Sequence, residues 1–576
     1  MTVRWGYLRR LLAGAIFGLY MAHLLYFVNP QIDITPARLL LVTLVYGVIC
    51  GILFGSILWI LRWLRVKIAG RTDEYRPHGF GLIVVSAFVS AAAYWVNLAI
   101  LRIYLPIGAV RILSKATTLI AATAFCLFAL WLIERTASVR VSRIIFLTGV
   151  VLIAVSSFFL YQRRDRYQND RKTPVVANIG EVAGQPPVIV VSIRDLPYDW
   201  LLTIMGEGEL PWFQKARSQS FLARIEPFPA SSSKSLLASL ATGKLPFRTG
   251  VTGRFSYQTL LTREGERFLI LPSGVGFRAW GLIPPVTRIS ARLPSGDALP
   301  MWQLFEKVGF STAVINWPST QADGTASGMV AERFFERRQN QEDLWPRLLT
   351  GRAESFRVGT QRIDPSLALR FDVIESNERK RRVLNALAED LTAEAATRSL
   401  FNPQQFTLTT LSLNGFSEAL SELAIDNLLP VRSVQKGEAI RAYLSHLDRF
   451  LSELEQAHPN MVIAVVSPSA RRAPDLPTTP LSFIRFFLQR DDPGSDDGFL
   501  LLRGPTIASQ QNATSAQVVD VVPTVLFAAG LPVGRDMDGR AVTEAFSEEF
   551  LRTNNLSLIQ TYEAESLQVI KDAQRR

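Results

Sequence analysis

The sequence FPASSSKSLLASLATGKLPFRTG, residues 228–250, decides how the rest of the chain is interpreted. Three serines, Ser231 to Ser233, stand directly before leucines at helical spacing, and Thr242 and Gly243 follow the leucines. Serine is a common N-cap, and a glycine in the left-handed conformation commonly ends a helix. The stretch is therefore predicted to be a helix that serine caps and that ends at Gly243.

A buried strand is predicted upstream of this helix. Residues 188–193 read VIVVSI, a β-branched run between Pro187 and the polar pair Arg194-Asp195. In α/β proteins, a helix start beside the end of a parallel strand is a common place for a bound phosphate or a nucleophilic hydroxyl. The alternative is that the serines do nothing except cap the helix.

Helical and strand-like runs alternate through the rest of the chain. In order they cover about residues 200–220 (helix), 312–317 (strand), 406–413 (strand), 438–456 (helix) and 461–467 (strand). Strands separated by helices are typical of a mostly parallel sheet. We expect one α/β domain at residues 187–576, called the large domain, after a polar linker at residues 162–186.

Residues 1–161 are predicted to form an α-helical transmembrane domain. Five apolar runs there are each close to the roughly 20 residues with which a helix spans a bilayer. They cover residues 11–28, 39–61, 80–101, 117–133 and 144–161. The first run is too long, and too closely followed by the second, for a cleaved signal peptide. We therefore expect a multi-pass protein of the plasma (inner) membrane.

The formal net charge of +12 belongs to the membrane flanks. Residues 1–172 contain 20 Lys and Arg against 6 Asp and Glu, whereas acidic and basic residues nearly balance in the remainder. The positive-inside rule and anionic headgroups favour this distribution, and it does not indicate a nucleic-acid-binding surface on the large domain. Membrane lipid is thus an expected partner, and nucleic acid is not.

Basic clusters also predict the orientation of the chain. They precede the first span, follow the second and follow the fourth: Arg4, Arg9, Arg10; Arg62, Arg65, Lys67, Arg71, Arg76; Arg135, Arg140, Arg143. Such segments stay in the cytoplasm, so five spans place the large domain outside it. If the third or fourth span were re-entrant, the large domain would be cytoplasmic instead.

Histidine and cysteine inside the predicted spans suggest little chemistry. Cys50 and Cys126 both fall in spans, so we expect no disulfide and no thiolate metal site in the large domain. We interpret His23 as a packed or interfacial side chain, because no carboxylate shares its apolar run.

Seven motifs follow one another in the large domain. They are VIVVSIRDLPYDWL, ELPWFQKARSQS, SSSKSLLASLATGKLPFRTGVTG, MWQLFEKVGFSTAVINWPSTQADGTASGMV, AYLSHLDRFLSELE with VIAVVS, GFLLLRGPTI, and VVDVVPTVLFAAGLPVGRDMDGR. In this order they resemble the alkaline-phosphatase superfamily, most closely its type I phosphodiesterase/nucleotide pyrophosphatase branch. With its preceding spans the chain also looks like the membrane-bound headgroup transferases and polymer synthases of that superfamily. The resemblance implies an alkaline-phosphatase-like fold.

The resemblance also implies a chemistry. Those relatives use two metal ions, usually zinc, held by Asp and His, and the metals activate a Thr or Ser nucleophile and bind the phosphoryl group. Counted nine residues before Thr242, the nucleophile position falls on Ser233. At the first metal-binding position, an Asp followed by Gly in the family, this chain has Arg194-Asp195. Arginine stays protonated, so it would place a permanent cation there.

Other positions of the family's metal ligands are replaced as well. The D-x-x-x-H motif aligns with residues 414–418, from Asn414 to Glu418, and S-D-H-G aligns with Ser467-Pro468-Ser469-Ala470. The last family histidine corresponds to Gly494 or Ser495, and the H-G after the nucleophile helix corresponds to Thr249-Gly250.

A census of the large domain agrees with these replacements. Its two histidines, His446 and His458, lie on or just after one amphipathic helix, where we interpret them as solvated. Carboxylates that could in principle hold magnesium or manganese are Asp195, Asp199, Glu418, Asp496 and Asp497. We expect no metal and no other cofactor.

Three functions remain open on this basis. The first is a membrane-anchored, catalytically degenerate relative that binds a ligand or acts as a scaffold, with another membrane protein as a further partner. The second is an active phosphodiesterase or phospho-headgroup transferase that uses Ser233 and an unconventional metal site. The third is a transporter or channel, against which the lack of charge inside the spans argues.

The first function predicts an anion site without metal. Its residues would be Arg194, Ser233, Lys234 and Asn414, around the start of the capped helix. A guanidinium and the free amides of a helix start can hold a phosphate, such as that of a lipid or an anionic envelope polymer. The alternative is that Arg194 pairs with Asp195, Asp199 or another carboxylate and closes the pocket.

Overall fold

The computed structural model describes most of the chain. The described residues are 2–32, single positions between 35 and 67, 79–102, 105, 107–136, 139–162, 175–179, 185–208, 210–226, 233–253, 255–259, 262, 266–272, 286–290, 298–318, 328–331, 363–400, 406–423, 434–468, 497–564 and 567–571.

The chain divides into two compact units. The membrane unit combines Met1–Gln168 with the segments Phe255–Ser290 and Leu476–Asp492, and the α/β unit contains the remaining residues. The boundaries predicted at residues 161 and 187 stay predictions. The sequence did not indicate that Phe255–Ser290 groups with the membrane helices.

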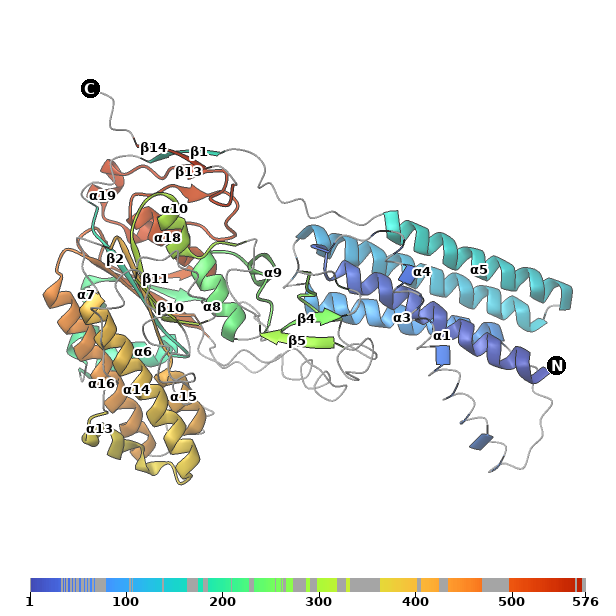
Figure 1. The fold of residues 1–576 in the computed structure, drawn as a ribbon, viewed down its shortest axis with the longest axis horizontal. Helices are drawn as coiled ribbons and strands as arrows, with labels where there is room; N and C mark the ends of the chain where they lie inside the picture. The colour runs from blue at the N-terminus through green and yellow to red at the C-terminus, as the bar shows by residue number, and fades with distance from the viewer. Residues whose placement is uncertain are drawn as a thin grey trace. The chain divides into compact units, whose positions relative to one another are not determined.

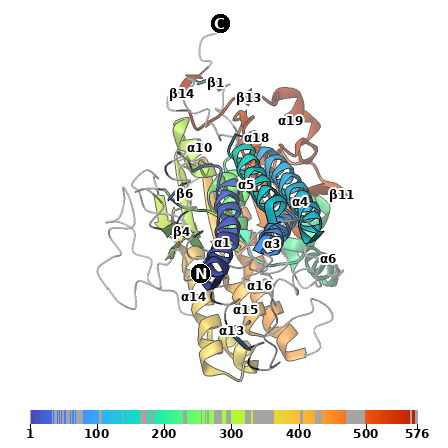
Figure 2. The same ribbon diagram turned by 90° about the vertical axis from the view of Figure 1, so that its right-hand side faces the viewer.

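Four helices of the membrane unit are described. They are α1 (Thr2–Phe27), α3 (Gly79–Leu101), α4 (Ile107–Thr136) and α5 (Val139–Gln162), and Figure 2 shows them side by side. Three stretches are long and apolar enough to cross a membrane, namely Phe80–Leu101, Gly108–Thr136 and Ile144–Gln162. They coincide with the predicted third, fourth and fifth spans.

The count of five spans is not confirmed. The apolar part of α1, Leu12–Phe27, is shorter than the other three stretches. The predicted span at residues 39–61 lies largely outside the described residues.

The outer and inner faces of these helices differ as expected for a membrane bundle. Large apolar side chains such as Phe125, Ile144 and Leu147 are more than 60% exposed, which lipid tails would tolerate and water would not. Inside, Tyr20 and Ser156 join their hydroxyls at 2.8 Å, as polar side chains often do between membrane helices. His23 is buried, in agreement with a packed side chain.

The segment Phe255–Ser290 contains a hairpin that belongs to the membrane unit. Strands β4 (Phe255–Thr259) and β5 (Val286–Ser290) pair antiparallel. Just beyond the end of α1, the buried Asn29 accepts hydrogen bonds from the backbone N–H groups of Leu269 and Ile270 and donates one to the carbonyl of Ile270. The hairpin segment is therefore fixed to the end of α1.

An eight-stranded mixed sheet forms the centre of the α/β unit. Its order is β11-β3-β10-β9-β2-β8-β6-β7, and β10 runs antiparallel to both neighbours while the other pairs are parallel. The strands are β2 (Val188–Ile193), β3 (Phe221–Ile225), β6 (Thr312–Trp317), β7 (Gly328–Ala331), β8 (Leu408–Leu413), β9 (Val462–Ser467), β10 (Gly498–Arg503) and β11 (Gln510–Ala516). The predicted mostly parallel sheet is confirmed.

Helices cover both faces of this sheet (Figure 1). One face packs on α8 (Ser233–Thr242), α10 (Met301–Lys307), α18 (Val521–Ala528) and α19 (Glu548–Thr553). The other face packs on α6 (Tyr198–Glu207), α7 (Pro211–Gln219), α14 (Asn377–Leu400), α15 (Gly415–Glu422) and α16 (Val434–Ala457). Alternate residues of each central strand enter opposite cores, which explains why these strands are apolar throughout.

Shorter elements complete the unit. They are α9 (Pro246–Thr249), α13 (Pro365–Arg370), the 3-10 turns Phe371–Val373, Val518–Asp520 and Thr543–Ala545, and the strand pairs β12 (Val533–Gly534) with β13 (Leu558–Ile559) and β1 (Val175–Ile179) with β14 (Leu567–Lys571). The segment expected to be a linker thus contains a strand that pairs with the end of the chain.

Two local predictions can be compared with the structure directly. The serine-rich helix ends at Thr242 and Gly243 has φ +66, so its predicted glycine stop is confirmed. The single helix expected near residues 200–220 is wrong. It divides into α6 and α7, because Gly208 adopts φ 74 and Pro211 begins a new helix.

Candidate functional site

Polar residues gather where the parallel strands of the sheet end. Arg194 and Asp195 follow β2, Asn414 follows β8, and Arg224 lies near the end of β3. Asp497 stands at the same edge, because β10 runs in the opposite direction and begins just after it. This edge is where open α/β sheets usually bind ligands.

The backbone adopts an uncommon conformation at two positions of this edge. Asp195 has φ 61 and Asn316, in β6, has φ 52; among the described residues no other side-chain-bearing residue has a positive φ. Asp and Asn tolerate this region better than other residues, yet it still costs energy. The carboxamide of Asn316 donates to the carbonyl oxygen of Ser412 at 3.0 Å, which ties β6 to β8. Hydrogen bonds of the two side chains, from Asn316 to Ser412 and from Ser417 to Asp195, accompany this backbone conformation.

Arg194 lies against Asn414 across two neighbouring strands. Its Nη1 donates to Asn414 Oδ1 at 3.1 Å, and its backbone N–H donates to the carbonyl of Leu413 at 3.3 Å. The side chain is half-buried. Within the described part of the chain, no carboxylate lies at ion-pair distance from this guanidinium. The cation therefore has a neutral partner and further N–H groups to donate.

The carboxylates closest in sequence to Arg194 have other partners. Asp195 accepts from the hydroxyl of Ser417, on α15. Asp199 and Asp497 both face Arg224, at 3.5 and 3.1 Å, and the Arg224 guanidinium lies over the Tyr198 ring. Sequence reasoning did not single out Arg224, because β3 had not been predicted. Arg224 is the compensated cation of this edge.

The two remaining residues of the predicted anion site belong to α8. Ser233 is the first residue of this helix, and its side chain lies outside the described residues, as do Ser231 and Ser232. Lys234 follows and is half-buried. The backbone of α8 thus begins where the sequence predicted, with Ser233 at its start.

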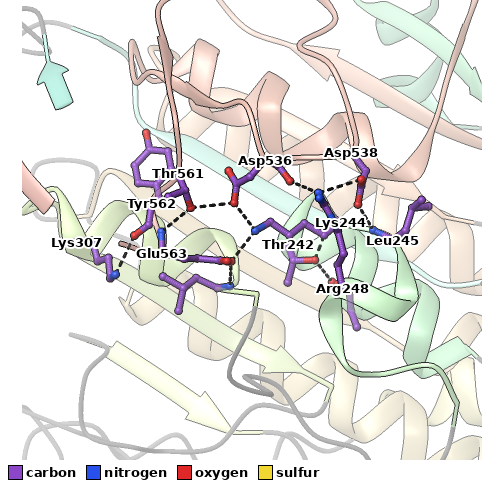
Figure 3. Close-up of polar contacts among 12 residues, drawn as sticks. Thr242, Lys244, Leu245, Arg248, Lys307, Asp536, Asp538, Thr561, Tyr562 and Glu563 are labelled. Carbon is purple, nitrogen blue, oxygen red and sulfur yellow. Dashed lines mark hydrogen bonds and ion pairs between the residues drawn. The ribbon is translucent and has the colours of Figure 1, made fainter. Parts of the chain in front are cut away.

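The opposite end of α8 is fastened by a buried lysine (Figure 3). Lys244 Nζ lies 2.6 Å from Asp536 Oδ2 and 2.7 Å from Glu563 Oε1, and the lysine side chain is only 6% exposed. Asp538 accepts from the N–H of Leu245 at 2.8 Å and pairs with Arg248 at 3.2 Å. These contacts fix the C-terminal end of α8, and through the rigid helix they set the position of its start.

The described residues do not assemble the two-zinc site that the resemblance implies. Arg194 and Asn414, which the sequence predicts at two positions of metal-binding Asp, bond to each other. His446 contacts Glu394 at 2.8 Å between α16 and α14, and His458 follows α16. Within the described ranges, no group of three or more His, Cys, Asp or Glu side chains could hold a metal.

Several aligned positions, and one candidate carboxylate, fall outside the part of the chain that the structure describes. They are Ser469, Ala470, Gly494, Ser495 and Asp496. The other four candidate carboxylates are described. Asp195 contacts Ser417, and Asp199 and Asp497 contact Arg224. The fourth is Glu418, on α15.

Comparison with known sequences gives no family. No family model matches the chain, and no curated protein matches it.

Solved structures with low similarity do exist. A protein predicted to be a sulfatase from Bacteroides thetaiotaomicron aligns with 12% identity and a TM-score of 0.39, over 64% of this chain and 75% of that one. A 2-O glycosaminoglycan sulfatase gives 12% and 0.37 over the same shares, and murine ectonucleotide pyrophosphatase/phosphodiesterase 5 gives 11% and 0.32 over 63% and 100%. Such scores do not assign a family or an activity. The described residues show apolar helices and, in the other unit, a mostly parallel mixed sheet of an α/β fold.

Proposed function

We propose that this protein is a membrane-anchored binding module for phosphodiesters and that it does not hydrolyse them. The observation that carries the proposal is the Arg194 guanidinium at the C-terminal edge of the sheet, bonded to Asn414 and without a carboxylate partner among the described residues. A half-buried cation in this situation gains from an anionic ligand, because charge-assisted hydrogen bonds are stronger than neutral ones.

The proposed ligand site combines Arg194 with the start of α8. Ser233 begins this helix, and the positive end of the helix dipole at its start favours an anion. Lys234 and Asn414 complete the proposed set. Arg194 then supplies the positive charge that metal ions supply in active members of the alkaline-phosphatase superfamily. In this proposal the site holds no cofactor.

A phosphodiester ligand could come from two sources in a cell envelope. One is a lipid headgroup such as phosphatidylglycerol, and the other is a polymer of glycerol phosphate. The membrane helices favour both, because they tether the α/β unit to a membrane. We propose that the large domain is extracytoplasmic and that the membrane is the plasma (inner) membrane, with scaffolding of another membrane protein as a further role.

The proposal is tested with the full-length chain in nonionic detergent. We expect saturable binding of dihexanoyl phosphatidylglycerol, of a glycerol phosphate oligomer, or of both, and no binding of dihexanoyl glycerol, which lacks the phosphate. The stronger of the two phosphate ligands identifies the source. Absence of phosphate-dependent binding to either would end the proposal.

Turnover assays address the lack of catalysis separately. With magnesium, manganese or zinc added, we expect no hydrolysis of generic phosphodiesters, because a serine hydroxyl is a poor nucleophile without a metal or a base. Hydrolysis that Ser233→Ala abolishes would establish the alternative function, an active phosphodiesterase or headgroup transferase.

A further inference from the structure

A buried carboxylate lies directly behind the proposed anion site. Asp390, on α14, is 1% exposed. Its Oδ1 accepts from the N–H of Asn414 at 2.9 Å, and its Oδ2 accepts from the N–H of Gly415 at 2.7 Å and from the hydroxyl of Tyr443 at 2.6 Å. No motif in the sequence pointed to Asp390, because its partners, two backbone N–H groups and one tyrosine hydroxyl, are 24 or more positions away in the chain.

Asp390 holds the start of α15 through the N–H groups of Asn414 and Gly415, while the Asn414 side chain is directed elsewhere. Asn414 is the N-cap of α15, and an N-cap asparagine usually accepts a hydrogen bond from its own helix. Here the Asn414 side chain makes no such bond, and its Oδ1 accepts from Arg194 instead. The Asp390 carboxylate binds this turn through its two backbone N–H groups.

Gly415 makes this approach sterically feasible. A Cβ atom at Gly415 would lie 2.5 Å from Asp390 Oδ2 and 3.2 Å from the Tyr443 ring. Any side chain there would push the carboxylate away from the two backbone N–H groups. The contact between Asp390 and the turn therefore requires glycine at position 415.

Burial of the Asp390 carboxylate costs free energy. Burial raises the pKa of Asp390 to about 7, opposed by its hydrogen bonds from Tyr443, Asn414 and Gly415. Glu394, one turn further along α14, raises the pKa too. The three hydrogen bonds to Asp390 offset part of the cost of burying this carboxylate.

We infer that Asp390 is a positioning residue for the proposed anion site, holding the Asn414–Gly415 turn so that the Asn414 carboxamide orients the Arg194 guanidinium. This inference rests on the proposed function. The inference names a series of contacts. The Asp390 carboxylate binds the turn between β8 and α15, and the Asn414 side chain of this turn binds Arg194.

The matched control for Asp390 is Asp448. This second buried aspartate, on α16, accepts from the backbone N–H groups of Trp212 and Phe213 at 3.1 and 2.9 Å and so holds the start of α7. Its hydrogen bonds do not lead to Arg194. Asp390→Asn and Asp448→Asn remove the same charge from the same kind of contact.

The test measures binding of dihexanoyl phosphatidylglycerol to full-length variants. We expect Asp390→Asn and Asn414→Ala each to weaken binding about tenfold, as loss of a charged hydrogen bond does. The double variant should bind no more weakly than Asn414→Ala, because both changes act through the same carboxamide. Asp448→Asn should bind like the wild type.

A pH profile separates positioning from a general structural role. The phosphodiester keeps its single charge between about pH 5.5 and 8.5, so changes in its affinity report on the protein. Protonated Asp390 can no longer accept all three hydrogen bonds, and the wild-type affinity should fall as the pH is lowered through about 7. Among the described residues, the titratable groups that act on Asp390 are Glu394 on its own helix and Tyr443 on α16, and His446 on α16 contacts Glu394. His446→Gln should keep the profile, and Asp390→Asn should lose it.

The outcomes separate the inference from the function on which it rests. If the wild type does not bind the phosphodiester, the proposed function fails. If the wild type binds and Asp390→Asn binds equally well, or the losses of Asp390→Asn and Asn414→Ala add, the positioning role is overturned while the anion site remains. A profile unchanged in Asp390→Asn would overturn it as well.

Discussion

The ammonium of Lys244 lies 2.6 Å from the carboxylate of Asp536, a residue 292 positions later in the chain. The same ammonium reaches Glu563 at 2.7 Å, and Glu563 also accepts from the backbone N–H of Leu299 at 3.0 Å. One buried lysine thus joins the end of α8 to two segments of the C-terminal region.

Lys244→Met should therefore destabilise the protein strongly. Removing the lysine leaves two carboxylates buried or partly buried without their cation, and breaking a buried pair in this way costs about 3–5 kcal/mol. We expect a clearly lower thermal midpoint for the full-length variant. Arg552→Met is the matched control: Arg552 pairs with Glu548 at 3.0 Å, but both side chains are about 80% exposed. Equal midpoints for the two variants would contradict the role given to Lys244.

Much of the α/β sheet could be predicted, because its central strands are apolar throughout. The runs at residues 188–193 and 312–317 match β2 and β6, and 461–467 matches β9 within one residue. What could not be predicted was pairing at a distance. The short β3 alternates buried and half-buried residues over five positions, and its place next to β10 depends on contacts almost 280 residues away.

The candidate site shows the same limit. Arg194 could be singled out from its place after a strand, and Asn414 from its place after another. Asp390 could not, since an acidic residue within a charged helix normally faces solvent. Its contact with the turn depends on the close approach that Gly415 permits, which appears only when α14 and α15 are packed.

Asp390 should also make stability depend on pH. Its pKa is about 7 in the folded protein and 3.8 as an ordinary carboxyl, so the folded state binds the proton more tightly. Below about pH 4 the group is protonated in both states and burial carries no penalty. As the pH rises to about 7 the penalty develops, at roughly 1.4 kcal/mol per unit and roughly 4 kcal/mol in full. Above that range it is constant.

The measurement compares thermal midpoints of the wild type and Asp390→Asn across this pH range. Other titrating groups contribute to both proteins, so the difference isolates Asp390. We expect the wild type to lose stability relative to the variant between about pH 4 and 7. A difference that does not change with pH would show that the carboxyl has an ordinary pKa.

Removal of metal should leave the fold intact. The sheet has an apolar core on each face, and the described residues contain no cluster of three or more ligating side chains. The free energy of folding then needs no contribution from a bound ion. Excess chelator should leave the thermal midpoint of the full-length protein unchanged. Roughly stoichiometric zinc or manganese in the purified protein, with a midpoint that falls on chelation, would refute this.

The orientation of the chain is open to a direct test. Three basic segments are expected on the cytoplasmic side, and five spans then place the residues after Lys172 outside. A reporter that is active outside the cytoplasm, fused after Lys172, should be active. A reporter fused after Arg76 should not be. If the fusion after Lys172 is cytoplasmic, one of the predicted spans does not cross the membrane.

The binding of a phosphodiester by Arg194 is the central claim, and one titration tests it most directly. Full-length wild type, Arg194→Ala and Arg224→Ala are titrated with dihexanoyl phosphatidylglycerol in the same detergent. Arg224 is the control because Asp497 and Asp199 already compensate its charge at the same edge of the sheet. We predict that Arg194→Ala loses about 1.5–3 kcal/mol, or roughly ten- to hundredfold in affinity, and that Arg224→Ala binds like the wild type. Unchanged affinity in Arg194→Ala would contradict the account.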